Sequence, residues 1–111
     1  MRTRKSIVAK NLSELVKNQN KYDFTTFLKK IRSIYSIGRK VVEQDTGISH
    51  MKLVYFEGGY FMHVPDSIDL LTLSVYFEID EEILLSKAVK FIAEGKSTPY
   101  KPYKISRKNK A

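Results

Sequence analysis

The chain has 111 residues, contains no cysteine, and carries 20 Lys and Arg against 12 Asp and Glu, for a formal net charge of +8. This length accommodates one domain, and the absence of cysteine excludes disulfides, thiolate catalysis and Cys-ligated metal sites. The apolar runs are far shorter than the roughly 20 residues of a membrane span, so we expect a cytoplasmic protein without membrane contact.

Apolar residues three and four apart predict helices over 7–18, 24–35, 39–46, 50–57, 68–77 and 81–93. Local signals support several of the ends. Asp23, Ser49 and Asp80 have the side-chain oxygens that cap helix N-termini. Gly47 stands where a left-handed residue ends the helix over 39–46.

The segment 68–77 is predicted as a helix that buries Ile68, Leu71 and Val75, with Asp66 or Ser67 as its cap. Almost no strand signal and no internal repeat accompany the helices. The sequence therefore predicts an all-α fold, a compact bundle of about five to six short helices.

Residues 39–59 have the spacing of a helix-turn-helix unit. A short helix is followed by Gly47, which tolerates a positive φ angle, by Ile48, which we expect to be buried, and by the cap Ser49. This order allows the second helix to cross the first.

Residues 24–88 resemble the Cro and lambda-repressor-like (XRE) helix-turn-helix family, whose sequences carry the pattern Q-x-x-L-A-x-x-x-G-V-S-x-x-x-I-S-x-x-E-x-G. Here residues 39–59 read RKVVEQDTGISHMKLVYFEGG, in the same register and without a gap. The resemblance implies an ion pair between Arg32 and Glu57. It also implies a sequence-specific DNA-binding transcriptional regulator, a repressor of phage, plasmid or bacterial type.

Within this family the second helix of the motif enters the major groove and the first lies across the backbone. By register, the side chains expected to read base edges are His50, Met51, Lys52 and Tyr55. Those expected to contact phosphates are Arg39, Lys40, Ser49 and Tyr60.

The charge distribution agrees with a DNA partner. Residues 1–10 hold four basic side chains and residues 96–111 hold six, with no acid in either segment. Basic groups of this kind add affinity for phosphates, although solvated tails have the same composition. We divide the chain into a basic N-terminal extension with a helix (1–21), a helix-turn-helix DNA-binding domain (22–95) and a basic, mobile tail (96–111).

The resemblance also implies a homodimer that binds inverted half-sites about one helical turn, roughly 34 Å, apart. We expect the two copies to meet through the last helix. The residues expected at this contact are Ile83, Leu84, Val89 and Ile92.

An alternative function uses the helix-turn-helix module for protein–protein interaction, as in an antitoxin, an anti-restriction protein or a host-takeover factor. Glu43 replaces the family's Ala, the loop 60–64 is apolar, and acidic residues gather in 57–94. Catalysis is not expected, because His50 and His63 are the only imidazoles and no nucleophile or metal-binding motif occurs. No cofactor and no metal are therefore expected.

Overall fold

The computed structural model describes residues 4–98, and this range is all-helical, which confirms the predicted fold class. No strand occurs within it. The predicted tail over 96–111 lies mostly outside the described residues. The elements are α1 (Arg4–Lys17), the short 3-10 helix η1 (Gln19–Lys21), α2 (Phe24–Tyr35), α3 (Arg39–Thr46), α4 (His50–Gly58), α5 (Ser67–Phe77) and α6 (Glu81–Ala93).

The cap predicted at α2 makes its side-chain hydrogen bond, and the one predicted at α5 does not. The Asp23 side chain accepts a hydrogen bond from the backbone N–H of Thr26 at 3.0 Å. Asp66 occupies the N-cap position of α5, but its side chain makes no capping hydrogen bond. The expected position of the α5 cap is therefore confirmed, and its capping hydrogen bond is absent.

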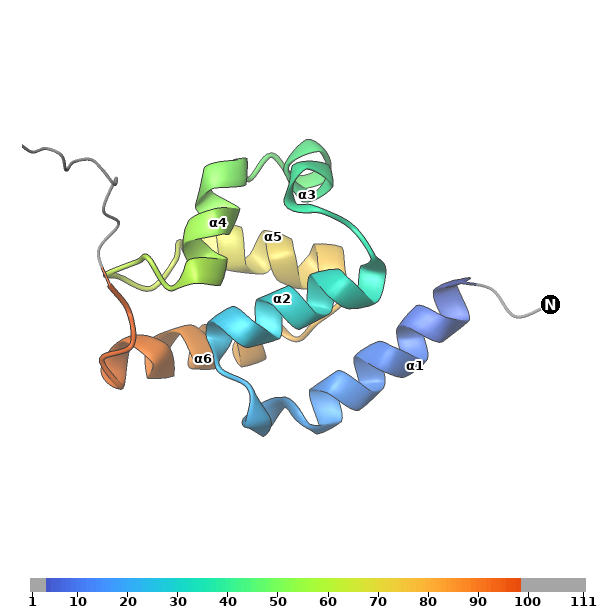
Figure 1. Ribbon diagram of the computed structural model, residues 1–111, viewed down its shortest axis with the longest axis horizontal. Helices are drawn as coiled ribbons and strands as arrows, with labels where there is room; N and C mark the ends of the chain where they lie inside the picture. Colours follow the sequence, from blue (N-terminus) through green and yellow to red (C-terminus); the bar gives the residue numbers. More distant parts are fainter. Residues whose placement is uncertain (1–3, 99–111) are drawn as a thin grey trace, which may run out of the picture.

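Helix α2 runs through the centre of the bundle and packs against α1, α4 and α6 (Figure 1). Its buried side chains are large: Phe24, Phe27, Leu28 and Ile31. The ring of Phe61, from the loop after α4, meets Phe24 edge-on with the ring centroids 5.4 Å apart. The apolar loop 60–64 thus contributes to the core through this one aromatic residue.

Helix α1 packs beside α2 at one side of the bundle (Figure 1). Leu12 and Leu15 are buried in the same hydrophobic core as the α2 side chains, whereas Ile7, one turn nearer the N-terminus, is exposed. The C-terminal part of α1 is therefore docked on the bundle by apolar packing.

Helix α5 buries a different face from the one predicted. Ile68, Leu71 and Val75 are 74%, 50% and 69% exposed. The residues of α5 that face the core are Leu70, Leu73, Ser74 and Phe77. Both apolar sets have the same spacing of three and four, so periodicity alone does not distinguish them.

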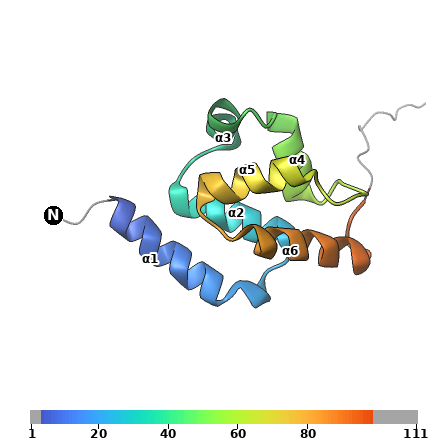
Figure 2. The ribbon, with the colours of Figure 1, turned by 180° about the vertical axis from the view of Figure 1, so that it is seen from behind.

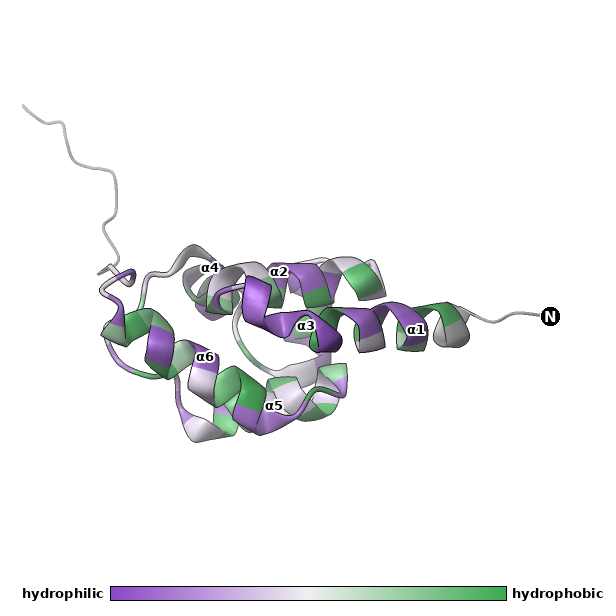
Figure 3. Ribbon diagram, turned by 90° about the horizontal axis from the view of Figure 1, so that it is seen from below, coloured by the Kyte–Doolittle hydropathy of each residue, from purple (hydrophilic) through white to green (hydrophobic). Residues whose placement is uncertain are grey.

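Helices α5 and α6 pack against each other and run in opposite directions on the side of the bundle seen in Figure 2. Leu85 and Val89 of α6 are exposed, four residues apart on one side of that helix. Hydrophobic residues are visible on both helices in Figure 3. We call the exposed set the α5–α6 face; it consists of Ile68, Leu71, Val75, Leu85 and Val89.

Lys87 of α6 fastens the connection between α1 and α2. Its ammonium donates hydrogen bonds to the backbone carbonyls of Gln19 and Tyr22, each at 2.6 Å. The same nitrogen stands 5.0 Å from the centroid of the Phe27 ring, within the range of a cation–π contact. Burial lowers the pKa of Lys87 from its ordinary value.

We expect Lys87→Met to lower the free energy of unfolding by about 1–3 kcal/mol, because two carbonyl oxygens lose a charged donor in a partly buried site. Urea denaturation followed by circular dichroism measures this change. Lys90→Met is the matched control, since the Lys90 side chain is 73% exposed. Equal stability of the two variants would contradict a fastening role for Lys87.

Candidate nucleic-acid interface

The turn between α3 and α4 is closed by short-range hydrogen bonds. Gly47 adopts a φ angle of 83° and ends α3, with its N–H donating to Glu43 O at 2.8 Å. The Thr46 hydroxyl donates to Val42 O at 2.7 Å and accepts from the N–H of Ile48 at 3.1 Å. These bonds fix the direction in which the chain leaves α3.

Buried side chains and a cap complete the unit. Val42, Ile48 and Leu53 are all buried and hold α3 and α4 on the core. Ser49 Oγ accepts a hydrogen bond from Lys52 N at 3.1 Å, as predicted for an N-cap. The two helices and their three-residue connection are therefore a rigid helix-turn-helix unit.

The structure brings together Arg32 and Glu57, the ion pair inferred from the sequence. The guanidinium of Arg32 binds both carboxylate oxygens of Glu57, with Nε to Oε2 at 2.6 Å and Nη2 to Oε1 at 2.8 Å. Its Nη1 also donates to Ile37 O at 3.1 Å. The hydrogen bonds to Glu57 raise the pKa of Arg32. The pair joins α2 to the C-terminal end of α4.

Arg39 belongs to the same cluster, which the sequence did not indicate. Its Nη1 donates to Glu57 Oε1 at 2.9 Å, and its Nε is buried without a hydrogen-bond partner among the described residues. The side chain keeps 34% exposure. Two guanidinium groups share one carboxylate, so the cluster retains one net positive charge at the start of α3.

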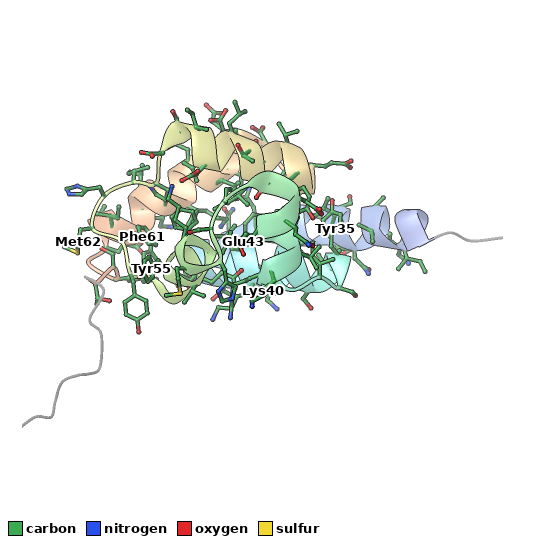
Figure 4. The ribbon with its side chains drawn as sticks, turned by 90° about the horizontal axis from the view of Figure 1, so that it is seen from above. Tyr35, Lys40, Glu43, Tyr55, Phe61 and Met62 are labelled. Carbon is green, nitrogen blue, oxygen red and sulfur yellow. The ribbon has the colours of Figure 1, made fainter. Side chains whose placement is uncertain are left out.

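Figure 4 looks onto the outer side of α3 and α4, where Lys40 and Glu43 come from α3 and Tyr55 comes from α4. Lys40 is exposed next to Arg39, and Glu43 is half-buried. Two cationic residues thus lie at the N-terminal end of α3, where the backbone N–H groups also favour an anion.

The four residues predicted to read bases differ in their exposure. Met51 is 45% exposed, and Lys52 is exposed as well. His50 and Tyr55 are half-buried. Among the residues predicted to contact phosphates, Ser49 is exposed while its Oγ caps α4, and Tyr60 is 41% exposed. Their positions in space are compatible with the predicted roles, which stay predictions.

Two contacts of α5 with the helix-turn-helix unit carry no local sequence signal. Lys52 Nζ lies 3.0 Å from Asp69 Oδ2, and this hydrogen bond raises the pKa of Lys52. The Tyr76 hydroxyl donates to the carboxylate of Asp45. Burial and this hydrogen bond raise the pKa of Tyr76 to about 12. Both pairs join residues more than 15 positions apart, so only the folded chain brings them together.

Comparison of the chain with protein-family models, with curated proteins and with solved structures finds no match. Over residues 4–98, no group of three or more His, Cys, Asp or Glu side chains could hold a metal ion. None of the helices in that range is both long enough and apolar enough to cross a membrane.

We expect Glu57→Gln to lower the free energy of unfolding by about 3 kcal/mol, because it leaves the partly buried Arg32 and Arg39 without their buried counter-charge. Chemical denaturation measures the loss. Glu43→Gln makes the same chemical change on α3 at a half-buried carboxylate outside the cluster, and should change stability by less than about 0.5 kcal/mol. Similar losses for both variants would show that the cluster does not hold the unit together.

Proposed function

We propose that this protein is a sequence-specific DNA-binding regulator of transcription that reads the major groove with α4. The observation that carries the proposal is the rigid α3–α4 unit with exposed Met51 and Lys52 on α4 and with Arg39 and Lys40 at the start of α3. This arrangement has side chains for base edges on one helix and cations for phosphates on the other.

The dimensions of α4 suit this role. It has nine residues, which at about 1.5 Å each make a rod of about 13 Å. One such helix fits into a major groove about 12 Å wide and spans only a few base pairs. Lys52 can donate to guanine O6 and N7, and Met51 offers an apolar contact to a thymine methyl group.

The resemblance of residues 24–88 to the Cro and lambda-repressor-like family supports the same proposal and favours a repressor that acts by occupying its site. The reach of one short α4 also favours a homodimer, because two copies double the length of DNA that is read. A regulator of phage, plasmid or bacterial type works in the bacterial cytoplasm, which holds the DNA.

We propose that the two copies meet through the α5–α6 face. The contact predicted from the sequence needs correction, because Leu84 is fully buried and Ile83 and Ile92 are half-buried. Of that set, Val89 alone is exposed. The face adds Leu85 and three residues of α5, and exposed apolar side chains gathered on two helices that pack together are typical of contact sites.

The alternative, a helix-turn-helix module for protein contact, is favoured by two observations. The α5–α6 face is apolar, and the charge of Lys52 is matched by the carboxylate of Asp69. In this alternative the exposed aliphatic side chains bind another protein and DNA binding is weak at moderate salt.

Selection from a random duplex pool, followed by fluorescence anisotropy at several salt concentrations, tests the proposed function. We expect the selected duplex to be pseudo-palindromic and to bind at least about a thousandfold more tightly than a scrambled duplex. Lys40→Ala should weaken binding to both duplexes alike and reduce the slope of log affinity against log salt by about 0.9. Equal, steeply salt-dependent binding of the two duplexes would contradict sequence-specific regulation. Absence of binding would favour the protein-contact alternative.

Sedimentation equilibrium tests the dimer. We expect the wild-type chain to show twice the 12.9 kDa mass of one copy, and Val75→Asp to give the monomer mass because it places a charge in the apolar contact. Val75 is 69% exposed, so the monomer should stay folded. Met62→Asp, at a 52% exposed loop position outside the face, is the control. A wild-type monomer with and without DNA, or a dimeric Val75→Asp, would exclude this interface.

A further inference from the structure

The single basic residue of α4 is paired with a carboxylate of α5. Lys52 Nζ and Asp69 Oδ2 are 3.0 Å apart, and the Asp69 side chain is only 13% exposed, whereas that of Lys52 is 48% exposed. Asp69 lies in the first turn of α5, close to the N-terminal end of α4. The carboxylate is thus largely covered by the bundle, whereas the lysine that reaches it keeps about half of its side chain exposed.

We propose that Asp69 is a specificity-determining positioning residue, which holds the Lys52 ammonium at the surface of α4 for a base contact and keeps it from neutralising phosphates. This inference rests on the proposed function. It concerns the ratio of specific to nonspecific DNA affinity and not the ability to bind DNA.

The chemistry of the pair supports such a role. An unpaired lysine has a long, flexible stem and a point charge that attracts any phosphate within reach, so it adds affinity for every sequence. An ammonium has three donors, and one bond to Asp69 leaves two for the O6 and N7 acceptors of a guanine. Tethering also removes part of the rotamer freedom that a base contact would otherwise have to restrict.

The neighbouring charges also weaken the attraction of phosphates to this end of α4. Asp66, at the N-cap position of α5, adds a weaker electrostatic attraction to Lys52, so this end of α4 has a second carboxylate in addition to Asp69. Lys52 and these two carboxylates together carry one net negative charge, so phosphates approaching there are not attracted. The cations left to bind phosphate lie at the other helix of the unit, in Arg39 and Lys40.

The test compares anisotropy titrations of the selected and the scrambled duplex for wild type, Asp69→Asn, Lys52→Met and the double variant. We expect Asp69→Asn to bind the scrambled duplex about threefold to tenfold more tightly, with a salt slope steeper by about 0.9, because Lys52 then neutralises a phosphate. Affinity for the selected duplex should rise less, so that the ratio of specific to nonspecific affinity falls. In the Lys52→Met background, Asp69→Asn should leave the ratio unchanged.

Asp45→Asn is the matched control, because Asp45 is a carboxylate on α3 that accepts its hydrogen bond from an uncharged group, the Tyr76 hydroxyl. Equal effects of Asp45→Asn and Asp69→Asn would overturn the inference, since loss of any negative charge would then suffice. An Asp69→Asn effect that persists with Lys52→Met would overturn it as well. If wild type discriminates between the duplexes and Asp69→Asn preserves the ratio, only this inference fails. If wild type does not discriminate, the proposed function fails with it.

Discussion

The buried carboxylate of Glu57 is the constraint on which the helix-turn-helix unit depends. Glu57 is 5% exposed and accepts hydrogen bonds from Arg32 on α2 and Arg39 on α3. One residue of α4 therefore joins three helices through charged bonds. Because a buried carboxylate is costly without its partners, the unit is stable only with α3 and α4 in this orientation. The same bonds hold Arg39 at the edge of the outer surface, where its side chain keeps 34% exposure.

Most helix limits could be predicted because local chemistry sets them. Gly47 ends α3 through its positive φ angle, and Asp23 and Ser49 cap α2 and α4 with side-chain oxygens three residues from their donors. These signals need no knowledge of the rest of the chain. The Arg32–Glu57 pair was inferred from a family resemblance. The third member, Arg39, was missed because nothing near it in the sequence points to a residue 18 positions away.

The face that α5 buries could not be predicted, since the helix has two apolar stripes with identical spacing. The set of Leu70, Leu73 and Phe77 and the set of Ile68, Leu71 and Val75 both follow a step of three and then four. Tertiary packing selects the first, which includes the aromatic ring of Phe77 against Tyr35 at a centroid distance of 5.3 Å. The second stripe is then left exposed. The sequence therefore contains more apolar residues at helical spacing than the core buries.

With this face buried, α5 takes part in two of the proposed roles, base recognition and dimer formation. Asp69 and Tyr76 bind Lys52 and Asp45 of the helix-turn-helix unit, while Ile68, Leu71 and Val75 point away from the core. One helix thus connects the proposed dimer contact to the residue that orients Lys52. A rotation of α5 about its own axis would disturb both at once. If two copies pair through this helix, the spacing of their α4 helices and the orientation of Lys52 are set by the same rigid element, so that dimerisation and base recognition favour the same arrangement.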